Sequence, residues 1–158
     1  MANALDKTDL AILNLLQTDA SLSTADIAEQ VNLSQTPCWR RIQRLEESGY
    51  IRQRIALLNR KTLGLNLVLY TEVKLIDNNE KTLKAFEEAV CKHAEITECY
   101  SMLGNTDFLL RIVTKDMDSY EHFFYKKLSK LPYIHAINSN AVLSELKNTQ
   151  ALPLKLIK

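Results

Sequence analysis

Apolar residues in the first fifty positions recur every three or four residues, which is the period of an amphipathic helix. The segment DKTDLAILNLLQTD places leucines and isoleucines near this spacing and offers Asp6 or Thr8 as its N-cap. Ser23 begins a second segment, STADIAEQVN, in which Asp26 completes a weak capping-box pattern. The pattern predicts two helices, the second of them short.

A third helix is predicted to begin after Ser34, in the segment SQTPCWRRIQRLEESG. Pro37 falls within its first turn, where the missing N–H of a proline is tolerated, and Gly49 ends the helix. Three short helices with a tight turn between the second and the third match a helix-turn-helix.

The third predicted helix has a polar, basic face. At about 100° per residue, the inner stripe of this helix consists of Cys38, Ile42 and Leu45. The opposite face consists of Thr36, Arg40, Gln43, Arg44 and Glu47, with Trp39 at its edge and Arg41 on the other flank. Six arginines stand against two glutamates between residues 40 and 60, so the local charge is +4 although the whole chain carries only +1. This local charge suits phosphates and base edges.

Outward arginines also occur on ordinary solvated helix faces, so their position decides the interpretation. This face lies on the last helix of a three-helix unit, and the segment GYIRQRIALL that follows it has apolar residues among arginines, as a wing strand beside DNA would. The sequence therefore predicts a winged helix-turn-helix that binds double-stranded DNA. The expected contacts are Ser34, Gln35, Thr36, Trp39, Arg40, Arg41, Gln43 and Arg44.

The period changes beyond Gly64 and Asn66. LVLYTEVKLI alternates apolar and polar residues as a half-buried strand does, and EKTLKAFEEAVCKH returns to helical spacing. Strands in ITECYSML and FLLRIVT, a helix between Asp118 and Pro132, and a last strand in IHAINSNAVLSEL follow. This order predicts a ferredoxin-like α+β sandwich with two helices on one face of an antiparallel sheet. Its open face, of mixed polarity, is expected to meet a second copy of the chain.

These patterns divide the chain into a helix-turn-helix domain at residues 1–52, a linker strand or hinge at 53–66 and a ferredoxin-like domain at 67–158. A chain of 158 residues with 46% apolar content has room for one core or two small ones. The N-terminus has no basic head followed by an apolar stretch, and no apolar run is long enough to span a bilayer. We expect a cytoplasmic, nucleoid-associated protein.

Three cysteines, Cys38, Cys91 and Cys99, lack the close spacing of zinc sites and disulfide frameworks. Cys38 falls on the inner stripe of the third helix, and no basic residue close in sequence indicates a lowered thiol pKa for the other two. The chain also lacks the Ser/His/Asp, Cys/His and HExxH patterns of hydrolases. We therefore expect no metal, no cofactor and no catalytic residue.

Residues 5–51, followed by LG, GNTDFLLRIV, LPYI and LKNTQALPL, resemble the Lrp/AsnC family of bacterial and archaeal transcriptional regulators. The most specific motifs are Leu-Ser-x-Thr-Pro-Cys and Gly-x-x-Asp-aromatic. The resemblance implies operator DNA as partner and a RAM or ACT-like C-terminal domain that dimerises, commonly builds octamers, and binds an amino acid where subunits meet. It also implies that Arg41 and Arg44 are usual in the family, whereas Trp39, Arg40 and Gln43 vary and would tune operator choice.

By the same resemblance, the turn GNTDF is the effector loop. Gly104 lets the backbone approach a ligand, and Asp107 has the charge to pair with an α-ammonium group. Asn105 and Thr106 would hydrogen-bond a carboxylate. The expected walls of the pocket are Met102, Ser139, Asn140 and Val142. A plain hairpin turn is the alternative, because glycine, asparagine and aspartate favour turns in any case.

Several alternatives stay open. Ile137 stands where the family often has threonine, so the effector is leucine, cysteine, asparagine, methionine, lysine or none. A tetrapyrrole decarboxylase-like enzyme on this fold would want histidines lining a large pocket, but the three histidines have no recurring spacing. An amino-acid sensor without DNA binding would have no reason to keep the basic face. The expected mechanism is a dimer whose paired third helices enter successive major grooves and whose assembly responds to the amino acid.

Overall fold

The computed structural model describes residues 5–157 and divides into two compact units. The first unit runs to Leu57 and also includes the chain from Lys147 onward, and the second runs from Leu58 to Leu146. This division differs from the expected domains chiefly at the C-terminus, because the last segment packs with the helix-turn-helix and not with the ferredoxin-like domain. The reason lies in contacts that sequence periodicity does not report.

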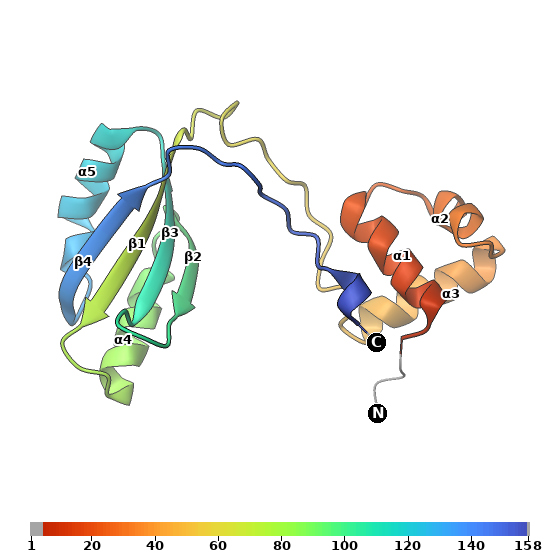
Figure 1. Cartoon of the computed structure of the whole chain (residues 1–158), viewed down its shortest axis with the longest axis horizontal. Helices are drawn as coiled ribbons and strands as arrows, with labels where there is room; N and C mark the ends of the chain where they lie inside the picture. Colours follow the sequence, from red (N-terminus) through yellow and green to blue (C-terminus); the bar gives the residue numbers. More distant parts are fainter. Residues whose placement is uncertain (1–4, 158) are drawn as a thin grey trace. The chain divides into compact units, whose positions relative to one another are not determined.

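The first unit contains the three predicted helices, α1 (Lys7–Thr18), α2 (Thr24–Gln30) and α3 (Gln35–Glu47), shown in Figure 1. Asp6 caps α1 and Ser23 caps α2, each in a reciprocal capping box. Between α2 and α3, Asn32 takes a left-handed conformation with φ of 54°, which asparagine tolerates better than most residues. The tight turn sets α3 against the same core as the other two helices. That core consists of Ile12, Leu13, Leu16, Ile27, Ala28, Cys38, Ile42 and Leu45.

The C-terminal segment completes this unit. The backbone N–H of Leu152 donates to Gln17 Oε1 at 2.8 Å, and Gln17 Nε2 donates to the carbonyl of Leu152 at 3.1 Å. A short turn of 3₁₀ helix, η2 (Leu154–Leu156), follows, and Leu154 packs against the helix-turn-helix core. The Gln17 side chain of α1 therefore binds both the backbone N–H and the carbonyl of Leu152, a residue far away in sequence.

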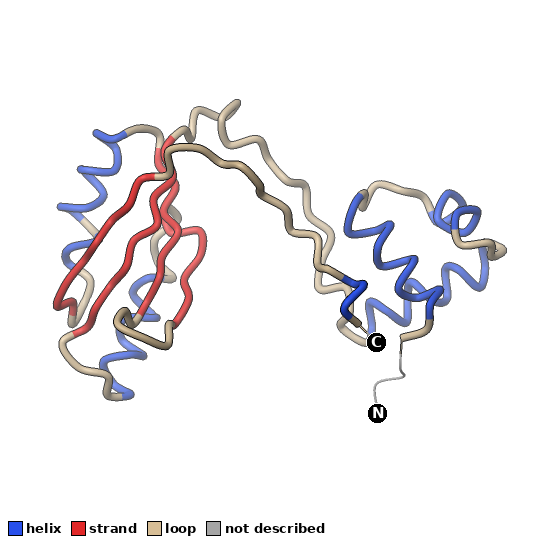
Figure 2. The backbone as a smooth tube through the Cα atoms, viewed as in Figure 1, coloured by secondary structure: helices blue, strands red, loops and turns tan. Residues whose placement is uncertain are grey.

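The predicted wing strand is not formed within this chain. Residues 52–66 contain turns and extended backbone without strand pairing, drawn as loop in Figure 2. Of the apolar residues that suggested the strand, Ile55 and Leu57 are exposed, and Ile51 packs against the helix-turn-helix core instead. A strand needs a neighbour to satisfy its backbone hydrogen bonds, and no described segment pairs with this one. Alternation of residue types along a single segment does not reveal whether such a neighbour exists.

The second unit is a four-stranded antiparallel sheet with two helices on one face (Figure 1). Its strand order, β2-β3-β1-β4, is that of the ferredoxin-like sandwich and confirms the predicted architecture. Its elements are β1 (Leu67–Leu75), α4 (Glu80–Val90), β2 (Ile96–Ser101), β3 (Phe108–Thr114), α5 (Met117–Lys126) and β4 (Ile134–Ala141), with one turn of 3₁₀ helix, η1 (Leu128–Lys130), after α5.

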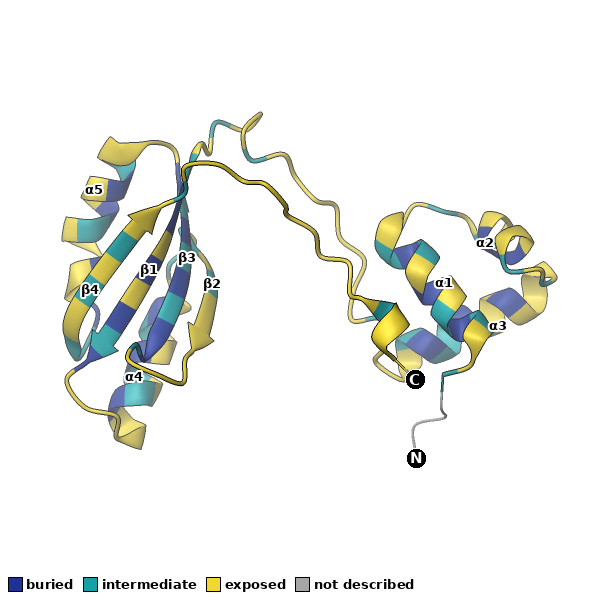
Figure 3. Cartoon of the chain, in the orientation of Figure 1, coloured by how far each residue is buried: buried dark blue, intermediate teal, exposed yellow. Residues whose placement is uncertain are grey.

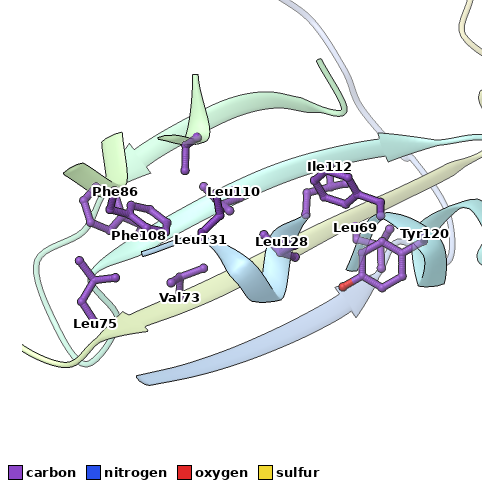
Figure 4. Close-up of a cluster of buried hydrophobic side chains, with 12 residues drawn as sticks. Leu69, Val73, Leu75, Phe86, Phe108, Leu110, Ile112, Tyr120, Leu128 and Leu131 are labelled. Atoms are coloured by element: carbon purple, nitrogen blue, oxygen red, sulfur yellow. The ribbon is translucent and has the colours of Figure 1, made fainter. Parts of the chain in front are cut away.

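The core of the second unit lies between the sheet and its two helices. Successive side chains of a strand point to opposite faces of the sheet, and every second residue is accordingly buried along β3 and along β1 from Leu69 onward (Figure 3). Phe86 of α4 packs against Phe108 of β3 with ring centroids 4.7 Å apart, and Tyr120 and Phe123 of α5 join the same cluster (Figure 4). The opposite face of the sheet carries exposed aromatic residues, among them Tyr70 and Tyr100.

Candidate DNA-reading helix and effector loop

The start of α3 is the most accessible part of the predicted DNA-binding surface. Ser34, Gln35, Thr36 and Arg40 are exposed, and the indole of Trp39 is 52% exposed. Ser34 occupies the N-cap position, yet its hydroxyl makes no capping hydrogen bond. The first N–H groups of α3 therefore lack the side-chain acceptor that caps α1 and α2, and helix N-termini of this kind favour anions such as phosphate.

Arg41 and Arg44, by contrast, bind carboxylates of α1 and its cap. Arg41 Nη1 lies 2.6 Å from Asp6 Oδ2 and 2.8 Å from Asp9 Oδ1, and Arg44 Nη2 lies 2.5 Å from Asp9 Oδ2. Asp9 is only 1% exposed, and its buried carboxylate is bound by these two guanidinium groups and by the backbone N–H of Asp6 at 3.1 Å. The sequence led us to expect that Arg44 projects freely outward. This expectation is corrected, because α1 packs against α3 and places the Asp9 carboxylate beside the Arg44 guanidinium.

These contacts also affect ionisation. The hydrogen bonds that Arg41 donates to Asp6 and Asp9 raise the pKa of its guanidinium. The pKa of Asp6 is lowered, first by the hydrogen bond from the backbone N–H of Asp9 and then by the one from Arg41. Both groups are therefore charged at neutral pH, and the cluster holds α3 against α1 by charge-assisted hydrogen bonds.

The C-terminal half of the reading face is partly neutralised. Gln43 is half-buried and donates its amide to Glu46 Oε2 at 3.2 Å, and Arg54 pairs with Glu46 Oε1 at 2.8 Å. Arg40 forms no ion pair with any described residue. Of the arginines on α3, Arg40 is thus the one whose charge is available to a phosphate.

A pocket of about 210 Å³ opens at the start of α3, lined by Thr24, Gln35, Thr36 and Trp39. Three of these residues were expected at the DNA interface. Thr24, the first residue of α2, was not, because nothing in its local sequence shows that the turn at Asn32 folds it towards α3.

The predicted effector loop begins at Gly104, within the connection that runs from Met102 to Asp107 between β2 and β3. The backbone N–H of Met102 donates to the carbonyl of Asp107 at 2.9 Å and closes the loop. Gly104, at φ of 145°, has a conformation that favours glycine, and no atom lies within 4 Å of where its side chain would start. Asn105 is exposed and Thr106 half-buried. The loop thus presents small polar groups to solvent, beside the exposed apolar side chains of Met102 and Leu103.

Asp107 does not point freely out of this loop. Its carboxylate accepts the backbone N–H of Leu75 at 2.7 Å and binds Lys74 Nζ at 2.9 Å, and the residue is only 8% exposed. Burial alone would raise the pKa of Asp107, but the Leu75 N–H and the Lys74 ammonium outweigh it and lower the pKa below its usual value. An ammonium of the protein itself therefore occupies the position expected for the α-ammonium of an effector.

The remaining expected wall residues lie on β4 and just beyond it, on two different faces. Ser139 lies on the helix-covered side, where its Oγ accepts the Tyr120 hydroxyl at 2.6 Å and lies 3.0 Å from Thr71 Oγ1. Asn140 is opposite Tyr70 on the open face, and the N–H of Val142 donates to the carbonyl of Val68. Because β4 is an edge strand and the loop joins β2 to β3 at the other edge, one chain does not bring these groups together.

Comparison with known proteins identifies both units. Residues 68–152 match the Lrp/AsnC ligand binding domain, and residues 5–52 match a winged helix-turn-helix DNA-binding domain. The chain belongs to the Lrp/AsnC family. It is a DNA-binding transcriptional regulator with a ligand-binding domain, and its relatives are transcriptional regulators and not enzymes.

Three relatives of this Lrp/AsnC regulator show how far the similarity extends. The transcriptional regulator AzlB of Bacillus subtilis is 34% identical over 154 residues, which is 98% of each chain. A crystal structure of a transcriptional regulator in complex with L-Met from Neisseria meningitidis is 35% identical, covers 96% of this chain and 97% of its own, and has a TM-score of 0.92. An AsnC family regulator from Agrobacterium tumefaciens is 38% identical, covers 96% and 98%, and has a TM-score of 0.91.

Other chemistry has little support in the part of the regulator that the structure describes. Burial, with the nearby Cys91 and Glu87, raises the pKa of the Cys99 thiol to about 11, so this thiol is a poor nucleophile at neutral pH. Residues 5–157 contain no group of three or more histidine, cysteine or acidic side chains placed to hold a metal ion. None of the described helices is long and apolar enough to cross a membrane.

Proposed function

We propose that this Lrp/AsnC regulator reads its operator with the exposed start of α3, through Ser34, Gln35, Thr36, Trp39 and Arg40, with Gln43 contributing from the next turn. Arg41 and Arg44 act as positioning residues, because their guanidinium groups bind α1 and set the angle of α3. The observation that carries this proposal is the contrast between Arg40, which forms no ion pair within residues 5–157, and the two arginines bound to Asp9. Such a protein works at the nucleoid.

We also propose that the effector site is completed by a second copy of the chain. Two facts support this. The loop at Gly104–Asp107 and the open-face residue Asn140 do not meet within one chain, and the open face of the sheet carries exposed Tyr70 and Tyr100. Dimers pairing through this face, assembled further into octamers, would bring a loop of one subunit near β4 of another.

We propose an amino acid as the effector. Methionine is tested first because the crystal structure of a relative that is 35% identical contains that protein in complex with L-Met. In this chain, Asn105, Thr106 and the loop backbone would hold the ligand's polar groups and Met102 would contact its side chain. Asp107, bound to Lys74 and Leu75, shapes the loop and contributes to the site indirectly.

The DNA half is tested by comparing Arg40→Ala with Arg44→Ala on specific and random duplexes at several salt concentrations. Without the Arg40 guanidinium, binding to all sequences should weaken and the salt slope should fall by about one for each phosphate that is no longer neutralised, while thermal unfolding is unchanged. Arg44→Ala should also weaken binding but lower the unfolding temperature, because Asp9 loses a partner. Unaltered DNA affinity of Arg40→Ala would remove it from the interface.

The effector half is tested by calorimetric titration with L-methionine and then the other amino acids, using wild type and Asn105→Ala. Asn105 is exposed, so the variant should fold normally and lose most of the affinity. Asn148→Ala, an exposed asparagine of the C-terminal segment, is the matched control and should bind as wild type does. Equal affinity of all three proteins would place the site elsewhere.

A further inference from the structure

The pocket lined by Thr24, Gln35, Thr36 and Trp39 carries an inference about which base pair the regulator selects. We infer that it receives the 5-methyl edge of a thymine in the major groove, so that the regulator requires an A·T pair at that position of each half-site. This inference rests on the proposed reading by the start of α3. It names the chemistry that one part of that surface recognises.

The walls of the pocket match the edge of an A·T pair. Two threonines and a tryptophan line the pocket, and the threonine methyl group and the indole are groups that can make the apolar contact through which proteins recognise the thymine methyl in the major groove. Gln35 adds an amide, the group that pairs with N6 and N7 of adenine. An A·T pair presents both features side by side, and the four lining side chains present both complements.

The same lining disfavours a G·C pair. Guanine is read most often by arginine or lysine and cytosine by a carboxylate, and none of these side chains lines the pocket. The nearest guanidinium groups in the sequence are accounted for otherwise, since Arg41 binds Asp6 and Asp9. Arg40, one residue beyond Trp39, is assigned to a phosphate.

Trp39 is central to this inference because its indole, at the start of the reading helix, is 52% exposed. The exposed part of the Trp39 ring gains apolar contact only when a bound molecule, here the DNA, covers it. Trp39 is also the only tryptophan in the chain, so its fluorescence reports directly on this pocket.

The test removes only the methyl group. Full-length protein selects a duplex from a random-sequence pool, and that duplex is then made with uracil in place of thymine at one symmetric pair of positions at a time. At one such pair, wild type should lose about fourfold in affinity per half-site, the value of one buried methyl group. Binding of the selected duplex should change the Trp39 fluorescence, and uracil at that pair should reduce the change.

Two variants connect the effect to the pocket. Trp39→Ala should bind the thymine and uracil duplexes equally, whereas Trp39→Phe should keep most of the difference. Tyr125→Ala, which removes an exposed aromatic ring of the second unit, is the control and should discriminate as wild type does.

Three results would overturn the inference. The first is that uracil has no effect at any position, and the second is that uracil weakens wild type and Trp39→Ala equally. The first would show that no thymine methyl group is read, and the second would place methyl reading outside the pocket; both would leave DNA binding intact. The third is that no duplex is enriched from the pool, in which case the proposed reading of DNA fails and the inference fails with it.

Discussion

Each unit of the regulator buries one carboxylate, and the two are held in different ways. Asp9, in the helix-turn-helix, is bound by Arg41 and Arg44, whose side chains are 30% and 40% exposed. Asp107, in the ferredoxin-like unit, is bound by a backbone N–H and one lysine. Both carboxylates also accept a backbone N–H, Asp9 from Asp6 at 3.1 Å and Asp107 from Leu75 at 2.7 Å. The difference is therefore in the number of cations, because Asp9 joins two guanidinium groups whereas Asp107 binds one ammonium. Helix packing in the reading unit is more sensitive to charge than sheet packing in the other.

Replacing Asp9 should have the largest effect. Asp9→Asn removes the carboxylate that Arg44 binds and leaves Arg41 with that of Asp6 alone, so it should destabilise the first unit by about 3 kcal/mol. Denaturation followed by Trp39 fluorescence measures this unit alone, because the second unit has no tryptophan. Asp19→Asn, at the exposed end of α1 where the carboxylate binds only Ser21 among the described residues, should change stability much less. Equal losses in the two variants would show that the ion pairs of Asp9 contribute nothing.

Replacing Asp107 should have a smaller and separable effect. Asp107→Asn weakens the bonds to Leu75 and Lys74 and should cost about 2 kcal/mol, seen in the circular dichroism of the sheet and not in Trp39 fluorescence. The folded-state pKa is lowered, so the stabilisation is complete above the unfolded value of about 4 and disappears as pH falls through the folded value. The difference between wild type and variant should therefore shrink on acidification. A difference that grows towards low pH would contradict this ionisation.

The smallest effect concerns the segment that joins the first unit from the far end of the chain. Gln17→Ala removes both hydrogen bonds to Leu152 and should cost about 1 kcal/mol, with faster hydrogen exchange at the Leu152 amide. Gln30→Ala, at the exposed end of α2, is the matched control. Unchanged exchange in Gln17→Ala would show that Leu154 alone holds the segment.

Periodicity in the sequence was sufficient for most of the fold. The three N-terminal helices and the order of strands and helices that follow are confirmed, because each element records its own buried face in the spacing of its apolar residues. The prediction of a wing strand was wrong for a related reason. Ile55 and Leu57 have the spacing of a strand, but strand pairing also needs a neighbouring strand, which local spacing does not encode.

The candidate sites were harder to predict because they depend on contacts between elements. Helical projection placed Arg44 on the polar face correctly, yet it gave no sign that Asp9 lies opposite. The composition of the segment likewise put Asp107 in a polar turn, without showing that Lys74 binds its carboxylate. Ser139 and Asn140 were grouped as neighbours, although adjacent residues of a strand point to opposite faces. Thr24 was missed altogether. The DNA and effector roles of these residues remain predictions.

The return of the chain from the second unit to the first has a consequence for exchanging domains between regulators. A fragment ending at Leu57 lacks Leu152 and Leu154, and so lacks part of the surface that covers its own helices. A chimera that keeps the operator choice of one relative and the effector response of another therefore needs two splice points, one near residue 57 and one near residue 147. If the two parts were joined only near residue 57, the helix-turn-helix would pack against the C-terminal segment of the other relative and not against its own.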